Sequence, residues 1–225
     1  MIVEIVILAM IAAFLGLRLY SVLGRRAEHD EEALMGHLPR ATEPRQPASG
    51  QPGDGSPTRV TDAGAALDRA LAGVPMAAQR AVREIAAADR RFAPLAFIEG
   101  AKAAYAMILE AFWKGDRETL NQLCDDDVYA SFVAAIDARE AAGETVENRL
   151  IRINEAEIVS ADFNSPMARI TVRFAADIAA LTKDSEGNMI AGSLDDAIES
   201  HDVWTFSRKV TAMRPDWLLD ETDEG

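Results

Sequence analysis

The chain is poor in cysteine, in aromatic residues and in positive charge, and each shortage excludes a class of protein. It has one cysteine, Cys124, in 225 residues, so no intrachain disulfide can form. Three aspartates follow Cys124, and nearby carboxylates disfavour a thiolate, so we expect a buried structural cysteine rather than a nucleophile. Aromatic residues make up only 6%, which favours alanine-rich helices over a large aromatic core. A net charge of -14 argues against broad nucleic-acid binding, which needs clustered lysine and arginine.

Residues 1–23 are apolar except for Glu4 and Arg18, which predicts a single-span membrane anchor. Arg18 can extend toward the interface, and the basic region and cleavage site typical of a secretory signal are absent. Arg18, Arg25 and Arg26 are the positive charges that flank the span, and all follow its apolar run, so the positive-inside rule predicts a cytoplasmic C-terminal domain. The alternative is a buried or peripheral helix.

Residues 24–63 predict a disordered proline-rich linker, because five of the nine prolines fall between residues 39 and 57 among Gly, Ser and Gln. His29 and His37 lie in this segment without further ligands, and we predict no metal site. Residues 64–90 predict two short connecting helices, broken near Gly73 and Pro75. The second helix has an apolar stripe beside a basic face, which can dock on its own domain, on a partner or on acidic lipid headgroups.

A long helix is predicted from Pro94 to about Lys114. Pro94 suits a first helical position, and the apolar side chains after it recur every three or four residues on one face, which we expect to be buried: Phe97, Ala101, Ala104, Tyr105, Ile108 and Phe112. Gly115 can close this helix and Asp116 can cap the next, over 117–123. A third helix is expected from about residue 126 to 139.

The pattern then changes to strands. Residues 149–163 are rich in Ile and Val and lose their alternation near Asn154 and Glu155, which predicts a bulge. Residues 168–178 give the clearest alternation, and further strands are predicted at 201–210 and 216–220. Helices followed by antiparallel strands predict an α+β domain over residues 91–225, with the helices on one face of a curved sheet.

Two ordered sets of residues carry a resemblance to a known family. The first lies in the long helix and the break after it: Phe97, Ala101, Tyr105, Ala111, Gly115, Asp116 and Leu120. The second lies in the last two strands: Trp204, Thr205, Phe206, Arg208, Trp217 and Leu219. In this order and spacing, they resemble the Tim44-like domain family over residues 75–222. That family includes the C-terminal domain of the mitochondrial import-motor tether, a mitochondrial ribosomal protein and bacterial membrane-anchored relatives.

The resemblance implies a cone-shaped fold similar to nuclear-transport-factor-two-like proteins, in which helices line an apolar pocket against a bent sheet. The ligand-pocket candidates are Phe97, Ala101, Tyr105, Ile108, Phe174, Trp204 and Phe206. It also implies a membrane-linked scaffold; the mitochondrial relative holds a DnaK-type chaperone beside a protein-conducting channel and contacts anionic lipid. This chain differs in having an apolar anchor and linker in place of the long basic chaperone-binding region. Residues 91–225 hold 13 Lys and Arg against 26 Asp and Glu, which disfavours broad electrostatic lipid binding.

Cone-shaped folds of this kind also include isomerases and dehydratases, which use a carboxylate or histidine with a tyrosine in an apolar pocket. The candidates are Tyr105 or Tyr129 with Asp177, Asp202 or His201. For these residues we favour a structural role over a catalytic one. His201 lies on the opposite strand face from Trp204, and Asp202 is expected to pair with Arg208 at the sheet rim.

We therefore expect no enzyme activity, no catalytic residue and no cofactor. The sequence predicts an adaptor or scaffold in a bacterial inner membrane, with its Tim44-like domain in the cytoplasm, acting in membrane-protein biogenesis, translocation or quality control. Its expected partners are the membrane, through the N-terminal helix, and membrane-associated proteins, but no nucleic acid. The alternative is a module that binds an acyl chain or phospholipid. The third and least favoured hypothesis is an isomerase or dehydratase.

Overall fold

The computed structural model describes residues 67–213 and 216–224. Its helices are α3 (Met76–Ala88), α4 (Pro94–Lys114), α5 (Arg117–Leu123) and α6 (Asp126–Ala141), and its strands are β1 (Thr145–Asn164), β2 (Met167–Lys183), β3 (Met189–Lys209) and β4 (Leu218–Glu224). The predicted anchor, its flanking Arg18, Arg25 and Arg26, and the linker all lie outside the described residues. None of the helices in the described part is long and apolar enough to cross a membrane.

The helix boundaries follow from residues that satisfy the free backbone groups at each end. Pro94 begins α4, and Gly115 ends it in the left-handed conformation, with φ 72°. Asp116 then caps α5, because its side chain accepts a hydrogen bond from the Thr119 amide at 3.0 Å. Asp125 caps α6 in the same way, accepting from the Val128 amide at 2.9 Å. The predicted break at Gly115 and Asp116 is confirmed.

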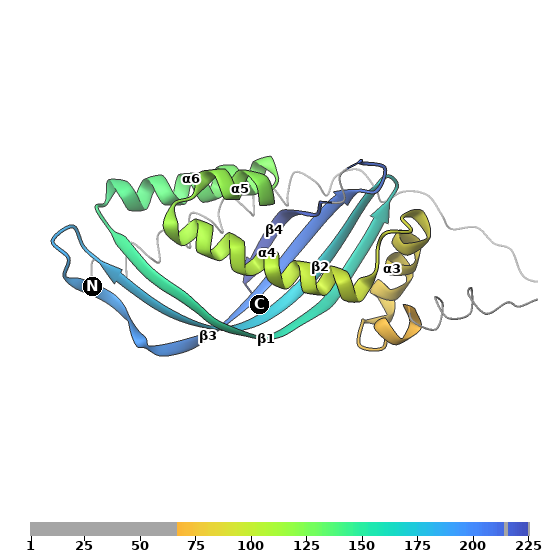
Figure 1. Ribbon diagram of the computed structural model, residues 1–225, viewed down its shortest axis with the longest axis horizontal. Helices are drawn as coiled ribbons and strands as arrows, with labels where there is room; N and C mark the ends of the chain where they lie inside the picture. Colours follow the sequence, from red (N-terminus) through yellow and green to blue (C-terminus); the bar gives the residue numbers. More distant parts are fainter. Residues whose placement is uncertain (1–66, 214–215, 225) are drawn as a thin grey trace, which may run out of the picture. The chain divides into compact units, whose positions relative to one another are not determined.

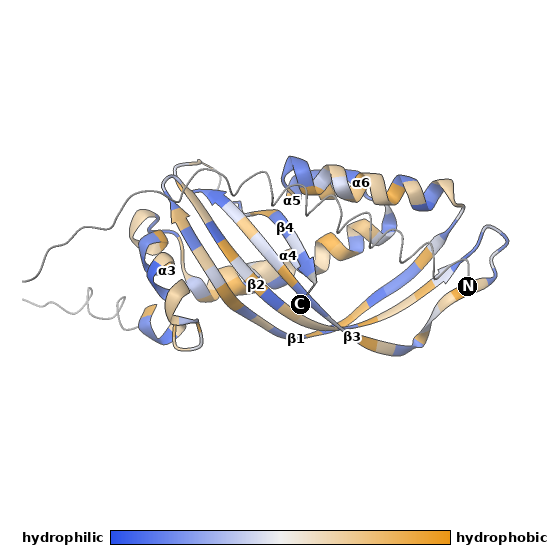
Figure 2. Ribbon diagram, turned by 180° about the vertical axis from the view of Figure 1, so that it is seen from behind, coloured by the Kyte–Doolittle hydropathy of each residue, from blue (hydrophilic) through white to orange (hydrophobic). Residues whose placement is uncertain are grey.

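The four strands form one antiparallel sheet in the order β1-β2-β3-β4. β2 lies in the interior of the sheet, where Ile170 pairs with Phe206, Val172 with Trp204 and Phe174 with Asp202. The alternation along the strands appears as hydrophilic and hydrophobic bands in Figure 2. β1 shifts register against β2 at three places, and one of them, between Ile153 and Glu155, confirms the predicted bulge.

The sheet has an outer half that β4 does not reach. β4 pairs with β3 only between Asp202 and Ser207, so the beginning of β1, the end of β2 and the beginning of β3 form a three-stranded extension. This extension bends away from the rest of the sheet in Figure 1. Gly192 permits a close approach within it, because a Cβ there would lie 2.0 Å from the carbonyl oxygen of Ala180.

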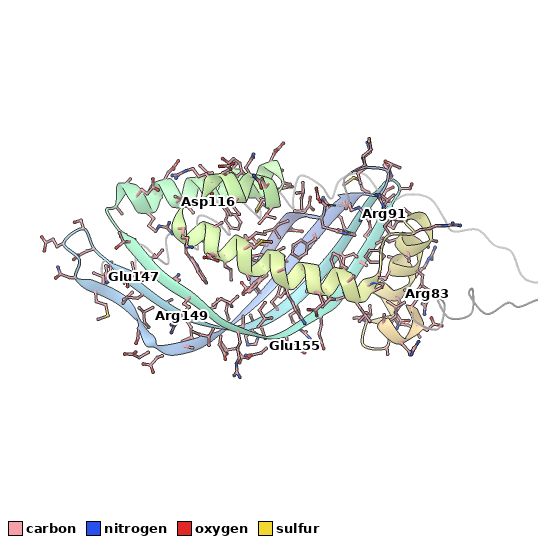
Figure 3. All side chains as sticks on the ribbon, in the orientation of Figure 1. Arg83, Arg91, Asp116, Glu147, Arg149 and Glu155 are labelled. Carbon is pink, nitrogen blue, oxygen red and sulfur yellow. The ribbon has the colours of Figure 1, made fainter. Side chains whose placement is uncertain are left out.

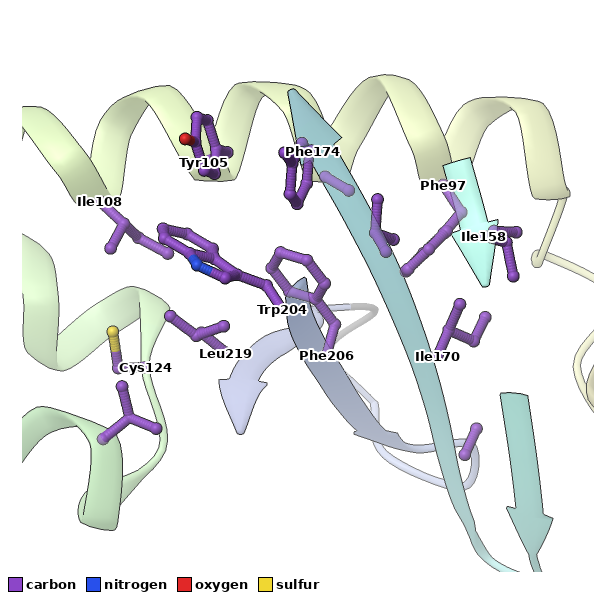
Figure 4. Packing of buried hydrophobic residues seen from close by; sticks show 14 of the residues in the cluster. Phe97, Tyr105, Ile108, Cys124, Ile158, Ile170, Phe174, Trp204, Phe206 and Leu219 are labelled. Carbon is purple, nitrogen blue, oxygen red and sulfur yellow. The ribbon is translucent and has the colours of Figure 1, made fainter. Parts of the chain in front are cut away.

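The core lies between one face of the sheet and the helices, with α4 crossing that face (Figure 1). The predicted apolar stripe of α4 is buried at Phe97, Ala101, Tyr105 and Ile108, whereas Phe112 is only half-buried. Figure 4 shows Phe97, Tyr105 and Ile108 of α4 on the same side of the sheet as Phe174 of β2 and Trp204 and Phe206 of β3. Leu219 of β4 joins the core beside α6, since its carbonyl accepts a hydrogen bond from the Asp125 amide at 2.8 Å.

The connecting segment before α4 is docked on the domain. Residues 67–70 are helical, and Leu71, Val82 and Ile85 are almost completely buried in the same core as α4. Burying three such side chains contributes about 1.5–3 kcal/mol each. Of the three surfaces on which this helix, α3, was expected to dock, its own domain is the one that buries the apolar stripe.

The predicted α+β class, with helices packed on an antiparallel sheet, is confirmed. The N-terminal transmembrane helix and the cone-shaped, nuclear-transport-factor-two-like character of the fold stay predictions.

Candidate functional site

The predicted pocket residues form a packed aromatic cluster. Phe97, Ala101, Tyr105, Ile108, Phe174, Trp204 and Phe206 are all buried. Tyr105 stacks on Phe174 with a centroid distance of 4.4 Å and contacts Trp204 at 4.6 Å, while Phe97 meets Phe206 edge to face at 6.1 Å (Figure 4). Such contacts stabilise a core beyond simple burial. These side chains fill one another's space, and their role as a ligand pocket stays a prediction.

Tyr105 and Asp202 are the one enzyme-type pair among the candidates that the described structure brings together. The Tyr105 hydroxyl donates to Asp202 Oδ2 at 2.7 Å, and the Ser200 hydroxyl donates to the same oxygen at 2.9 Å. Burial, followed by the Asp202 carboxylate, raises the pKa of Tyr105 above its ordinary value, so the phenol remains a neutral donor. This geometry satisfies a buried hydroxyl within the core.

The other enzyme candidates lie apart from this pair. His201 is exposed on the opposite face of β3, as predicted, with Nε2 3.7 Å from Glu199 Oε2. Asp177 accepts hydrogen bonds from Arg152 at 2.7 Å and Asn154 at 2.9 Å on the exposed sheet surface, and Tyr129 is half-buried on α6. Among the described residues, no hydrogen bond joins any of these three to the Tyr105 hydroxyl, which donates to Asp202.

The predicted ion pair between Asp202 and Arg208 is wrong. The two residues share a strand face but lie six positions apart, about 20 Å along the strand. Asp202 instead reaches Tyr105, and Arg208 forms a buried ion pair with Asp89, at the C-terminal end of α3. Each charged side chain therefore has a partner in the helical layer, Tyr105 for Asp202 and Asp89 for Arg208.

The Asp89–Arg208 pair connects the helical layer to the sheet. Both side chains are about 5% exposed, and the guanidinium lies 5.7 Å from the Trp217 ring. Arg91 adds a backbone hydrogen bond to Asp89 Oδ1 at 3.0 Å. Burial raises the pKa of Asp89, but the Arg91 hydrogen bond and the Arg208 charge outweigh burial, so the net pKa lies below its ordinary value.

A cleft of about 740 Å³ lies beside the beginning of β1, and we call it the α4–β1 cleft. It is lined by Ala106, Glu110, Trp113 and Lys114 of α4, by Arg139 and Glu140 of α6, by Glu144, and by residues 145–150 of β1. Its volume is within the range of about 300–1,000 Å³ for ligand sites in proteins. None of the predicted pocket residues lines this cleft.

The walls of the α4–β1 cleft are held by hydrogen bonds and ion pairs. Arg139 donates to the carbonyls of Phe112 and Trp113 at 3.2 Å each, and thus ties α6 to the last turn of α4. Glu140 pairs with Arg117 at 3.0 Å. The cleft was missed because the end of α4 forms one part of its lining and residues 139–150 form the other, about 25 positions later in the sequence, and only the fold brings the two together.

The described residues give no support to metal or thiol chemistry at this site. Among residues 67–213 and 216–224, no group of three or more His, Cys, Asp or Glu side chains could hold a metal ion. Cys124 is buried, and burial together with the Asp125 charge raises its pKa to about 12, so the thiol stays protonated. The structural role predicted for Cys124 agrees with this environment.

Comparisons with known proteins identify the family. The Tim44-like domain profile matches residues 78–224. A probable mitochondrial import inner membrane translocase subunit, tin-44 of Caenorhabditis elegans, is 24% identical over 109 residues, which cover 48% of this chain and 26% of that protein. The chain thus spans about a quarter of its curated relative.

Two solved structures are similar over 56% of this chain. They are the intermembrane space region of the chloroplast protein ARC6, with 12% identity, a TM-score of 0.42 and 95% of that chain covered, and a conserved protein from Planctomyces limnophilus, with 19% identity, a TM-score of 0.33 and 94% covered. The profile match covers more than half of the chain and includes every described strand. The chain therefore belongs to the Tim44-like domain family.

Proposed function

We propose that this protein is a noncatalytic, membrane-anchored adaptor, and that its Tim44-like domain binds a membrane-associated partner in the α4–β1 cleft. The observation that carries the proposal is the cleft itself, in a domain of a family that includes a mitochondrial import translocase subunit. The proposed task is membrane-protein biogenesis, translocation or quality control, performed in the cytoplasm of a bacterium.

The N-terminal sequence supports the anchored arrangement. Residues 1–23 have the composition of a span, with Arg18, Arg25 and Arg26 after its apolar run. An anchor raises the effective concentration of the domain near other membrane proteins, so a modest affinity for the partner suffices. The domain carries excess negative charge, so the anchor rather than the domain surface supplies the membrane attachment in this proposal.

The environment of Tyr105 and Asp202 favours an adaptor over an isomerase or dehydratase. A tyrosine and a carboxylate in hydrogen-bond contact are a plausible acid–base pair only where a substrate can reach them. Tyr105 is fully buried between the rings of Phe174 and Trp204, and the α4–β1 cleft is lined by other residues. The pair is therefore better explained as part of the core.

An acyl-chain ligand is the alternative. It would need space among the same buried aromatic side chains, and their ring contacts oppose that without a rearrangement of the core. Native mass spectrometry of the purified protein distinguishes the two proposals. An acyl chain retained in every preparation would favour the lipid-binding alternative, and a ligand-free mass agrees with the adaptor.

Site-specific photo-cross-linking in membranes tests the adaptor proposal. A photoreactive residue at Lys114, which lines the α4–β1 cleft, should capture one abundant protein that mass spectrometry identifies as a component of membrane-protein biogenesis or quality control. The matched control is Arg80 on α3, whose side chain is 86% exposed and which does not line the cleft. Identical adducts from both positions, or none from Lys114, would contradict the proposal.

A further inference from the structure

β1 is an edge strand in the part of the chain that the structure describes, because the sheet order begins with it. Residues 145–150 pair with β2 on one side, and no other described strand pairs with them on the other. All six are exposed or half-buried. An edge strand presents a row of backbone N–H and C=O groups to whatever lies beside it, so this stretch is a template for strand pairing.

The α4–β1 cleft runs along this free edge. Residues 145–150 of β1 line it and no residue of the neighbouring strand β2 does, as expected for a cleft beside the strand rather than over the face of the sheet. Trp113 and Arg139 belong to the opposite wall, formed by α4 and α6. The cleft is thus a slot between a strand edge and helices, the type of place where an extended peptide is added to a sheet in peptide-binding domains.

In this stretch, apolar and charged side chains lie on opposite faces of the strand. Val146 and Leu150 lie on one face of β1, and Glu147 and Arg149 lie on the other, where Figure 3 labels them. Glu147 pairs with Lys183 at 2.5 Å. Arg149 has no ion pair among the described residues, so it is the lining charge most open to an incoming carboxylate.

We propose that the α4–β1 cleft binds an extended segment of a partner protein as an added antiparallel strand on residues 145–150. Read from its N-terminus, the segment has the pattern apolar–acidic–any–basic–apolar. This inference rests on the proposed adaptor function and specifies how that adaptor binds its partner.

The pattern follows from antiparallel pairing, in which opposite side chains lie about 4.5–5.5 Å apart. The acidic residue lies opposite Arg149, and the basic residue, two positions later on the same face, lies opposite Glu147. The apolar residues lie opposite Leu150 and Val146, on the other face. Backbone hydrogen bonds supply affinity, and the alternating charges select the sequence and its direction.

A blocked heptapeptide, Thr-Val-Glu-Ser-Arg-Val-Thr, is the probe, titrated by fluorescence anisotropy against the full chain in detergent micelles. A second peptide exchanges its Glu and Arg, so composition and net charge are unchanged. We expect the first peptide to bind about tenfold more tightly, since two favourable cross-strand pairs replace two like-charge contacts. Two further versions of the first peptide carry N-methyl groups at alternate residues. In one version the methylated amides are those that point toward β1, and in the other they are those that point away. Only the version whose methyl groups face β1 should lose binding.

Matched protein variants test the location of the site. The double variant Glu147→Arg/Arg149→Glu should reverse the preference and bind the exchanged peptide about tenfold more tightly. The control is Arg80→Glu/Glu84→Arg, which swaps an exposed pair on α3 and should leave the preference unchanged. Hydrogen exchange should also show slower exchange of the amides of residues 145–150 when the first peptide is bound.

Equal binding of the two charge patterns, retained preference in the Glu147→Arg/Arg149→Glu variant, or loss of binding with both N-methylated peptides would overturn the strand-addition proposal. Failure of this mode is distinguishable from failure of the adaptor function. If a Lys114 cross-link to a membrane-biogenesis protein persists while the peptides show no preference, the adaptor stands and its binding mode is different. If the peptides behave as expected but no such cross-link forms, the cleft binds strands and the adaptor function fails.

Discussion

Replacing Asp89 by alanine should lower the free energy of unfolding by about 3–5 kcal/mol, the usual cost of removing one partner from a buried ion pair. Asp89 and Arg208 are each about 5% exposed, so the guanidinium would lose its charged partner away from bulk water. Arg208 Nε already lacks a hydrogen-bond partner among the described residues. The variant would therefore keep a buried guanidinium, 5.7 Å from the ring of Trp217, without its carboxylate partner.

A double variant separates the ion pair from the packing around it. Asp89→Leu combined with Arg208→Met replaces both charges with apolar groups, and such replacements are often neutral or stabilising. The double variant should therefore be more stable than Asp89→Ala, and the difference measures the burial of one uncompensated charge.

The pair should also give the stability a defined pH dependence. The pKa of Asp89 in the folded protein lies below its ordinary value, as described above. Because the unfolded value is about 3.9, the stabilisation is present above that pH and is lost as the pH falls through the folded pKa. Wild type should lose stability in this acidic range more steeply than the double variant, which lacks the carboxylate.

Urea unfolding of the full chain in detergent micelles, followed by tryptophan fluorescence, is the assay. Trp204 is buried and Trp217 lies against Arg208, so both report loss of this packing. A cost for Asp89→Ala below about 1 kcal/mol, the average for point substitutions, would refute the reasoning. A double variant as unstable as the single one would also refute it.

Three further substitutions test other contacts by the same unfolding assay. Gly192→Ala should cost more than Gly187→Ala, because both glycines have positive φ but only at Gly192 would a Cβ meet a backbone oxygen, 2.0 Å away; equal costs would contradict this. Tyr105→Phe removes one of the two described hydroxyl donors of Asp202 and should cost about 1–3 kcal/mol, and an unchanged midpoint would show that the hydrogen bond is dispensable. Asp125→Ala removes the cap of α6 and should cost about 1 kcal/mol, whereas Asp125→Asn should retain most of the stability; equal losses would exclude capping as the cause.

The helical part of the fold could be predicted in detail because its signals are local. Pro94 begins α4, Gly115 ends it and Asp116 starts the next helix, and each residue acts on its own neighbours. The first part of the interior strand β2 was equally clear, since its buried residues from Ala168 to Phe174 alternate with more exposed ones. Local backbone chemistry and a single buried face were sufficient at these places.

The first half of β3 was not predicted, since residues 201–210 were expected as the strand but β3 begins at Met189. This half is mostly exposed and contains Asp195 and Asp196, so neither burial nor alternation reveals it. It is a strand because β2 continues beside it, with Gly192 pairing with Leu181. Pairing with a neighbouring strand is a tertiary effect, so it cannot be predicted from the periodicity of one segment alone.

The candidate site was the least predictable part. The periodicity of α4 predicted that Phe97 and Tyr105 are buried, but it could not distinguish a wall of an empty pocket from a filled core. The partner of Arg208 was missed because Asp89 lies 119 positions away, and only the docking of α3 on the domain brings the two together. The α4–β1 cleft likewise depends on the bend of the sheet, which follows from register shifts along β1.

Photo-cross-linking from Lys114, performed in membranes with the intact chain and with a chain lacking residues 1–23, tests the central claim most directly. If the protein is an anchored adaptor, the intact chain gives one identified membrane-associated partner through the α4–β1 cleft. Removal of the segment should strongly reduce the yield at the same expression level, while added purified domain at high concentration should restore it. An equal yield without residues 1–23, or no partner from either chain, would contradict the account.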